Sequence, residues 1–223
     1  MKKLLIIIST LLNVNLSAQQ KTVGVQFMPY TLMDYSPRVR IGVFYKAGNK
    51  MAYELDFGLG NLLLNKRRVD DLNLGTAYHF YELRPEIKYY FNKADAFNSY
   101  ISAEFFAIFL TNTFYNRYYH SEKSDLYIQY DRADFVKQKY GLHLKCGIEL
   151  IAWKFLIVDF YFGLGSAYRN INYKNIKNPQ EIGEFIFEEW WGHAYKYEGK
   201  SIIFHLTFGL NIGLQLVLKT HKK

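Results

Sequence analysis

Cysteine and proline are scarce in this sequence, which has one cysteine (Cys146) and 4 prolines among 223 residues. A lone cysteine far from the N-terminus excludes both an intrachain disulfide and a lipid anchor on an N-terminal cysteine. After the first segment no run of about 18 apolar residues occurs, so no transmembrane helix is predicted. The mean hydropathy of −0.15 still allows a membrane-spanning β-barrel, because only alternate residues of its strands face lipid.

The N-terminal segment has the three parts of a secretory signal peptide. Two lysines supply the positive charge, residues 4–12 supply an apolar core, and Ser17-Ala18 end a cleavage site of small residues. We expect residues 1–18 to be the signal peptide and residues 19–223 to form a single barrel domain. The alternative is that this segment is a strand or helix of the folded domain.

The formal net charge is +8, and it falls to +6 when the two lysines of the signal peptide are removed. A basic balance can indicate nucleic-acid binding. Here the lysines and arginines are scattered and the chain is predicted to be exported, so nucleic acid is excluded as a partner. Basic loops beside anionic lipid headgroups explain the charge more simply.

Tyrosine (20) and phenylalanine (18) are far above ordinary usage, and aromatic residues favour strands. The clearest strand is residues 201–219, where nine consecutive even-numbered positions from Ile202 to Leu218 are apolar and most odd-numbered positions are polar. A period of two predicts a strand rather than a helix. The length exceeds the roughly 9–11 residues that a tilted strand needs to cross a bilayer.

The same alternation recurs upstream and predicts eight strands in all. The other strands are expected at residues 23–30, 39–46, 53–60, 78–92, 100–114, 139–150 and 156–165. In the fifth strand, Phe106 and Ile108 interrupt the polar face, which indicates either a bulge or a bulky plug in the lumen.

The links between the strands alternate in length. Residues 47–49, 93–98 and 152–154 are tight links, residues 65–77, 115–136 and 170–200 are long ones, and the first link, near residues 33–37, is short but on the side of the long ones. Short turns at one end and long loops at the other are typical of transmembrane barrels. The sequence therefore predicts an all-β fold, an antiparallel up-and-down transmembrane β-barrel of eight strands.

A soluble barrel of the lipocalin type is the alternative, with the same period but with its apolar face inward and its charges outward. Two features favour the membrane barrel. One face of the strands holds carboxylates and cations in near balance, which suits an interior network. The other face is almost uncharged, and water would not tolerate so much bare apolar surface.

Two segments resemble small outer-membrane barrel proteins of Gram-negative bacteria that share the architecture of OmpA and OmpX. They are Leu83-Arg84-Pro85-Glu86-Ile87-Lys88-Tyr89-Tyr90-Phe91, and the hairpin at residues 147–165 with its Phe162-Gly163-Leu164-Gly165. The resemblance extends over residues 23–219 and implies an outer-membrane barrel, without implying an activity. Asn211-Ile212-Gly213 with Leu216 and Leu218 is similar to the C-terminal signal that the barrel-insertion machinery reads, although leucine replaces the usual aromatics.

Inward-facing positions carry charges of both signs. They are Glu54, Asp56, Glu82, Glu86, Glu104, Glu149 and Asp159, against Arg40, Arg84, Lys88, Lys139 and Lys145. An eight-stranded barrel is just wide enough for its side chains to fill it, and buried charges are costly unless they are paired. We predict a filled, salt-bridged lumen; the alternative is a selective pore or a proton path.

His143, Asp159 and His205 face inward on three successive predicted strands, with Thr207 beside His205. Barrel enzymes that modify lipid A use a serine, a histidine and an acid, and a hydroxyl nucleophile needs a base within hydrogen-bond reach. No serine on a strand joins these residues, so we predict no catalytic site; a lipid-modifying enzyme is the alternative. Two histidines without a paired motif do not make a metal site, and we expect no metal and no cofactor.

The sequence Phe-Gly-Leu-Gly occurs at residues 57–60 and again at residues 162–165. Both copies lie within predicted strands and precede no helix, so a phosphate-binding loop is excluded. Glycines that face inward let neighbouring aromatic rings lie flat and let the sheet curve.

Aromatic residues gather in two long links, which we treat as loops at residues 115–130 and 181–199. They are Tyr118, Tyr119 and Tyr127 in the first, and Phe185, Phe187, Trp190, Trp191, Tyr195 and Tyr197 in the second. Exposed aromatics anchor partners, so an extracellular ligand or protein is expected there. The alternative is an interfacial girdle or strands that extend past the membrane.

These patterns together predict a structural or surface-recognition role at the cell outer membrane. A small pore is a further alternative. The expected partners are outer-membrane lipid and lipopolysaccharide, the barrel-assembly machinery during insertion, and a ligand of the two aromatic loops.

Overall fold

The computed structural model describes residues 21–34, 36–48, 50–61, 77–93, 96–122, 124–183 and 197–218. Its strands are β1 (Lys21–Phe27), β2 (Val39–Ala47), β3 (Met51–Asn61), β4 (His79–Lys93), β5 (Phe97–His120), β6 (Tyr127–Ala152), β7 (Leu156–Lys177), β8 (Gln180–Gly183) and β9 (Gly199–Leu218). A short 3-10 helix, η1 (Pro29–Met33), follows β1. None of the helices in these ranges is long and apolar enough to cross a membrane. The predicted signal peptide, residues 1–18, lies outside the described residues.

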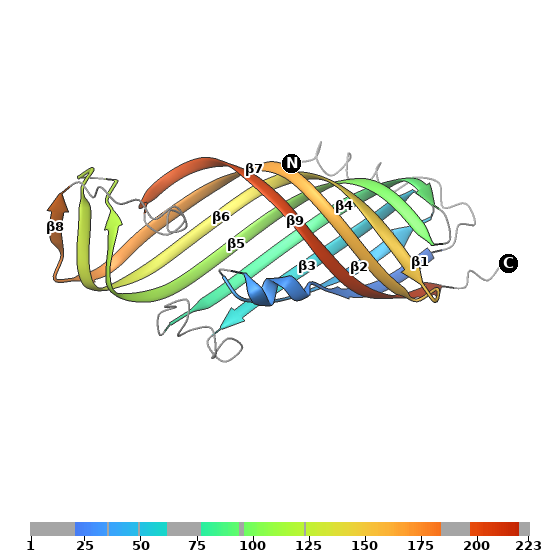
Figure 1. The fold of residues 1–223 in the computed structure, drawn as a ribbon, viewed down its shortest axis with the longest axis horizontal. Helices are drawn as coiled ribbons and strands as arrows, with labels where there is room; N and C mark the ends of the chain where they lie inside the picture. Colours follow the sequence, from blue (N-terminus) through green and yellow to red (C-terminus); the bar gives the residue numbers. More distant parts are fainter. Residues whose placement is uncertain are drawn as a thin grey trace, which may run out of the picture.

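Eight of the strands close into an antiparallel ring (Figure 1). Each strand from β1 to β6 pairs with the next, and β9 pairs with β7 on one side and with β1 on the other. β8 stands outside the ring and pairs with the far end of β6. The predicted all-β antiparallel barrel is confirmed.

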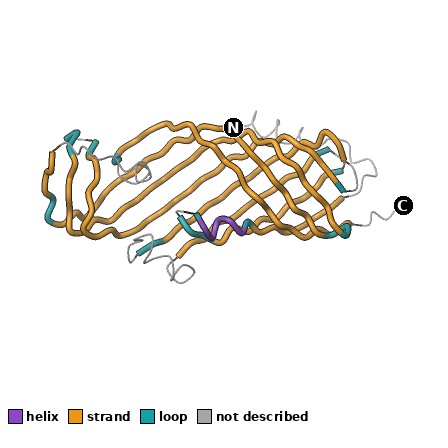
Figure 2. The backbone as a smooth tube through the Cα atoms, in the orientation of Figure 1, coloured by secondary structure: helices purple, strands orange, loops and turns teal. Residues whose placement is uncertain are grey.

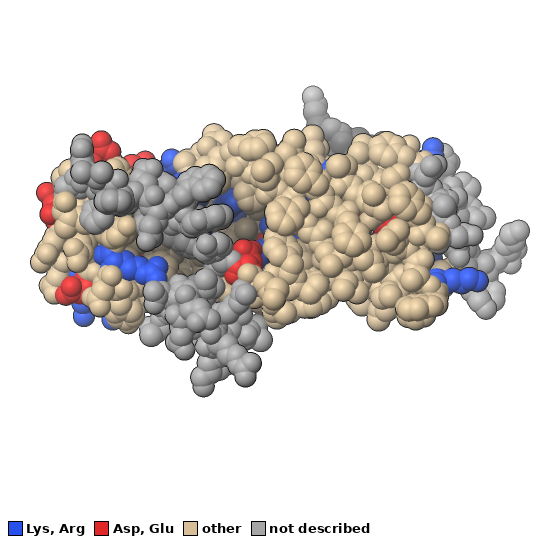
Figure 3. All heavy atoms as spheres, viewed as in Figure 1, with Lys and Arg blue, Asp and Glu red and all other residues tan. Residues whose placement is uncertain are grey.

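The two faces of the strands differ in polarity along the middle of the barrel. On β9 the outward side chains of Ile202, Phe204 and Phe208 are 80%, 70% and 65% exposed. Figure 3 shows this part of the surface as an almost uninterrupted area of uncharged residues. Strand geometry sends successive side chains to opposite faces, so the alternate polar residues point into the barrel. The predicted orientation of each face is confirmed on β3, β4, β6 and β7.

The three longest strands are β5 with 24 residues, β6 with 26 and β7 with 22, followed by β9 with 20. Beyond the apolar surface β5, β6 and β7 continue as a sheet of their own, which we call the distal sheet: residues 111–120, 127–138 and 169–177, with β8 at its edge (Figure 2). The prediction of long links at residues 115–136 and 170–200 is therefore wrong in part. Residues 115–120 and 127–136 form a paired hairpin around a short turn, and β7 runs on to Lys177.

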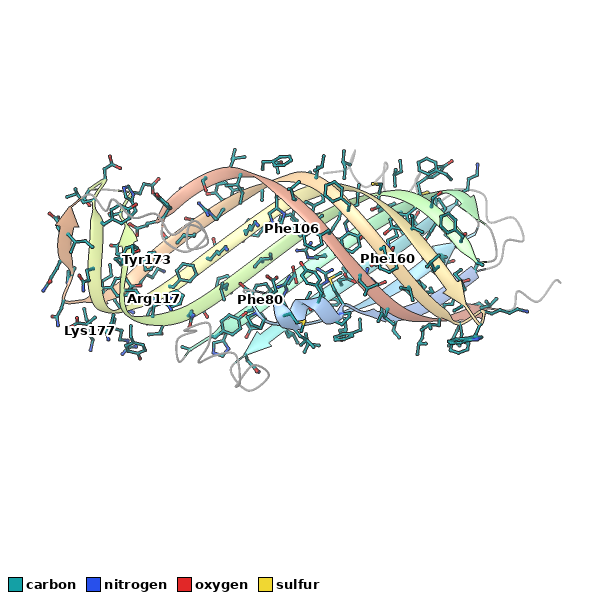
Figure 4. All side chains as sticks on the ribbon, in the orientation of Figure 1. Phe80, Phe106, Arg117, Phe160, Tyr173 and Lys177 are labelled. Atoms are coloured by element: carbon teal, nitrogen blue, oxygen red, sulfur yellow. The ribbon has the colours of Figure 1, made fainter. Side chains whose placement is uncertain are left out.

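The distal sheet has its own buried core, which continues the inward face of the strands. It consists of Tyr78, Phe80, Leu110, Phe114, Tyr119, Tyr130, Ala133, Phe135, Ile171 and Tyr173. Figure 4 places Tyr173 and Arg117 in this sheet, well away from Phe106 in the middle of the barrel. Burial of these rings explains why main-chain pairing persists so far along β5, β6 and β7.

The tight links lie where they were predicted, between β2 and β3, β4 and β5, and β6 and β7. The first strand is shorter than predicted, because β1 ends at Phe27 and not at Tyr30. Pro29 has no N–H to donate to a strand partner, and it begins η1 instead. The link to β2 is correspondingly longer than residues 33–37.

Candidate functional site: the charged barrel interior and its basic cavity

All the charged residues that were predicted to face inward are buried, and that prediction is confirmed. They are Glu54, Asp56, Glu82, Glu86, Glu104, Glu149, Asp159, Arg40, Arg84, Lys88, Lys139 and Lys145, each at most 8% exposed. Their parity in the strand fixes this placement. The interior of the barrel thus holds many buried charged groups.

At the end with the tight turns, lysines bridge carboxylates of distant strands. The Nζ of Lys88 lies 2.7 Å from Glu54 on β3 and 2.7 Å from Asp159 on β7. Asp159 also accepts a hydrogen bond of 2.7 Å from the hydroxyl of Tyr100. Lys46 pairs with Glu149 at 2.5 Å. The pairs Lys88–Asp159 and Lys46–Glu149 join strands that are not neighbours, so they cross the lumen and hold its walls together.

Glu104 is the centre of the middle layer. Its carboxylate oxygens lie 2.7 Å from Arg84, 2.6 Å from Lys145 and 2.8 Å from Nδ1 of His143. Lys145 also pairs with Glu86 at 2.5 Å. Such charge-assisted contacts satisfy a buried carboxylate that would otherwise be costly.

Phe106 forms the bulky plug that was one of the two interpretations of the fifth strand. It is fully buried, stacks on His143 with 4.6 Å between ring centroids, and lies 5.0 Å below the guanidinium of Arg84. The pairing of β4 with β5 shifts between Tyr90 and Asn92, and not near Phe106. The ring fits because Gly141 faces it, and a Cβ there would lie 2.5 Å from the ring.

The structure divides the three residues that were weighed as a catalytic set. Nε2 of His143 lies 2.6 Å from Nδ1 of His205, and the other nitrogen of His143 bonds Glu104. Asp159 belongs to the Lys88 layer instead. The acid partner of the histidines is therefore Glu104, which the sequence placed inward but not beside them.

Beyond the histidines, towards the distal sheet, the interior opens into a cavity of about 290 Å³. Its lining combines cations with the aromatic core above them, and includes Arg38, Arg40, Arg84, Lys137, Lys139 and His205. Arg38 was missed by the sequence analysis because it precedes the predicted second strand. It is nevertheless buried and pairs with Asp34 at 2.6 Å and with Glu82 at 2.5 Å.

The predicted aromatic loops have different outcomes. In residues 115–130, Tyr119 is only 4% exposed and stacks on Tyr173 at 4.2 Å, so it belongs to the core rather than to an exposed surface. Burial raises the pKa of both hydroxyls. In residues 181–199, Glu181 lies in β8 and Tyr197 contacts His120. Residues 184–196, which include Trp190 and Trp191, lie outside the described residues.

No group of three or more metal-binding side chains occurs within the part of the chain that the structure describes. Cys146 is a free thiol on the outward face. The candidate site is therefore the charged interior together with its basic cavity.

Two solved structures are similar to this chain over most of its length. The N-terminal β-barrel domain of OprF from Pseudomonas aeruginosa has a TM-score of 0.38 and 12% identity, over 89% of this chain and 98% of that one. A major outer membrane protein from Thermus thermophilus has a TM-score of 0.41 and 9% identity, over 90% of this chain and 100% of that one. No family model and no curated protein matches the chain.

Proposed function

We propose that this protein is an outer-membrane barrel that does not conduct and that holds the distal sheet outside the cell as a rigid surface for recognition. The exposed apolar side chains around the middle of the barrel, which we call the apolar belt, support a location in the membrane. Leu144 is 74% exposed and Phe160 48%, and each Å² of such surface costs about 25 cal/mol in water. A bilayer removes that cost.

The observation that carries the proposal is a change of polarity along single strands. On β6 the outward face passes from Leu144 and Leu142, both exposed, to Asp134 on the same face of the distal sheet. On β7 it passes from Phe162 to the exposed Lys174. Where a strand leaves the bilayer, its outward side chains must change from apolar to polar.

The lumen supports the absence of conduction. Ion pairs such as Lys88–Asp159 cross it, and Phe106 fills its middle layer. Opening a path would separate buried charges, which is costly. In planar bilayers the purified protein should give no channel events at voltages at which a general porin conducts. Stable unitary currents would contradict the proposal and favour a pore.

The orientation is tested by labelling single cysteines on intact cells, in a Cys146→Ser background. Ser124→Cys lies at the tip of the distal sheet and Lys50→Cys in the turn at the opposite end, and both positions are exposed. A membrane-impermeant maleimide should label Ser124→Cys on intact cells, and Lys50→Cys only after permeabilisation. Labelling of Lys50→Cys alone on intact cells would reverse the proposed orientation.

Recognition is tested with the folded protein on a glycan array. Tyr115 presents a ring that is 45% exposed on the distal sheet, next to Arg132 at 6.0 Å, and aromatic faces with polar neighbours suit sugars. Tyr115→Ala should abolish a glycan signal of the parent protein. Tyr140→Ala, a tyrosine 41% exposed within the belt, is the matched control. Equal binding by both variants, or none by the parent, would contradict glycan recognition.

A further inference from the structure

Among the strands that the structure describes, the wall of the barrel has a lateral gap beside β9. β1 pairs with β9 from Lys21↔Leu218 as far as Phe27↔Ile212. β9 continues to Gly199, and there it pairs with β7. Within the described ranges no strand pairs with the other edge of β9 between residues 199 and 211, and η1 lies there instead (Figure 1).

Burial along β9 records the same gap. The inward residues Ser201, His205 and Thr207 are only half-buried, whereas Asn211, beside the β1 pairing, is 3% exposed. The inward residues of the fully paired β4 are buried from Phe80 to Tyr90, the part of the strand whose side chains are described. As far as the described residues go, the interior is therefore less covered over the half of β9 that is nearer the distal sheet.

The basic cavity lies directly behind this gap. It is lined by Leu206 and Phe208, whose side chains are nevertheless 53% and 65% exposed on the outward face. Tyr30 of η1 also lines it and stacks on Phe208 at 6.0 Å. The cavity thus connects the charged interior with the apolar belt. Figure 3 shows charged atoms at this end of the uncharged surface.

Among the residues that the structure describes, cations outnumber carboxylates in the lining. Arg38, Arg40, Arg84, Lys137 and Lys139 line the cavity, and Asp34 is the carboxylate among its lining residues. Below the lining, Glu82 and Glu104 contact Arg38 and Arg84, and Asp56 lies 3.4 Å from Arg40. Within the described residues, the five cations of the lining thus face four carboxylates, Asp34, Asp56, Glu82 and Glu104, and Glu104 is also shared with Lys145.

Lys139 shows this excess most directly. It is 8% exposed, and no carboxylate in the described part of the chain comes within ion-pair distance of it. Its ammonium lies 5.6 Å from the ring centre of Phe106. A buried ammonium without a counter-ion is costly, and an anion in the adjacent cavity would offset that cost.

We propose that this cavity binds the phosphate group of a phosphorylated lipid, which enters sideways through the gap between β9 and η1. The inference rests on the proposed membrane location. Phosphate suits the lining because its several oxygens accept hydrogen bonds from arginine forks and lysine ammonium groups at once. The acyl chains of the lipid remain against Leu206 and Phe208, in the apolar belt. A free phosphate would use the cations and leave the apolar rim without a role.

The test measures binding to the folded protein in detergent by native mass spectrometry. The probes are phosphatidic acid, diacylglycerol with the same acyl chains, and inorganic phosphate. Phosphatidic acid should bind at least about tenfold more tightly than either of the other two, a difference of about 1.4 kcal/mol. Diacylglycerol binding equally well would show that the phosphate is not recognised. Equally tight binding of inorganic phosphate would mean that the ligand is a soluble anion, and it would overturn the proposal of a lipid.

Two variants assign the binding to this cavity. Lys139→Gln should weaken phosphatidic acid about tenfold, as loss of one charge-assisted contact predicts, whereas Lys177→Gln on the exposed distal sheet should not. Thr207→Phe keeps every charge and fills the cavity, and it should weaken binding as much. Unchanged affinity in both cavity variants would overturn the site. A parent protein that folds, reaches the outer membrane and still does not bind would overturn this inference alone.

Discussion

His143 and His205 meet inside the barrel because Gly165 lies between them. Gly165 on β7 pairs with His143 on one side and with His205 on the other. Lacking a side chain, it lets the two rings stack at 4.9 Å and bond at 2.6 Å between ring nitrogens. The second nitrogen of His143 is bonded to Glu104. One glycine thus permits a contact between strands that are not neighbours.

We expect Gly165→Ala to destabilise the barrel by roughly 1–3 kcal/mol, the usual cost of overpacking a filled interior. The new Cβ would lie 2.7 Å from Cδ2 of His143 and closer still to the carbonyl oxygen of Leu142. Urea unfolding in lipid vesicles, followed by tryptophan fluorescence, measures the effect. Ser166→Ala, the outward-facing neighbour, should change the free energy of unfolding by less than about 0.5 kcal/mol. Equal effects would mean that the histidine pair does not depend on Gly165.

Glu104→Gln should be among the most damaging polar substitutions in the interior. It leaves Arg84, Lys145 and His143 in place and removes the charge they share. Breaking a buried pair in this way costs about 3–5 kcal/mol. The same unfolding experiment measures it.

The matched control is Asp125→Asn, where the carboxylate is 95% exposed and lies 3.4 Å from His120. An exposed pair contributes at most about 1 kcal/mol. If both variants lost equally little, the interior network would not be what stabilises the barrel.

Leu144→Lys tests the position of the membrane. Leu144 is 74% exposed in the belt, and a lysine near the middle of a bilayer costs roughly 2–4 kcal/mol on the lipid face of a barrel. Gln138→Lys, on the same face of β6 but in the distal sheet, should cost no more than about 1 kcal/mol. Unfolding in vesicles compares them. If lysine were tolerated equally at both positions, the apolar belt would not lie in the bilayer.

The sequence predicted the strands best where lipid and lumen impose opposite polarity on alternate residues. In β4, Glu82, Arg84 and Glu86 alternate with apolar residues, and these three charged side chains are buried as expected. That contrast disappears in the distal sheet. There Tyr119 lies in the core, and the residue before it, Tyr118, is also a tyrosine, so polarity does not distinguish the two faces of the strand. A period of two cannot be read from such a segment, so the hairpin was predicted as a loop.

The candidate site could be predicted only in part, because it depends on register and on strand ends. Alternation places Glu104, His143 and His205 inside, but only the pairing Glu104↔His143 and the two pairings of Gly165 bring them together. The lateral gap arises from the difference in length between β1 and β9. Pro29 marks the end of β1 in the sequence, but nothing there shows that β9 continues, paired with β7, beyond its pairing with β1.

The stability of the distal sheet should depend on pH through Asp134. The hydrogen bond from Asn175, at 2.7 Å, is the largest influence that holds the pKa of this carboxyl below its usual range, and Thr113 donates a second at 3.0 Å. Arg132 adds an ion pair at 3.6 Å. Because the folded pKa is lowered, the stabilisation is fully present above the unfolded pKa, about 3.9. It is lost as pH falls through the folded pKa.

Hydrogen-exchange protection factors of the distal sheet, corrected for intrinsic rates, should therefore fall as the pH is lowered from about 5 to about 3. Asp134→Asn cannot ionise, so its protection should be lower at neutral pH and nearly flat across this range. Asn175→Ala removes the largest influence on the carboxyl and should reduce the pH dependence without abolishing it. If Asp134→Asn keeps the full pH dependence of the parent protein, another group controls the distal sheet, and the contacts of Asp134 do not stabilise it.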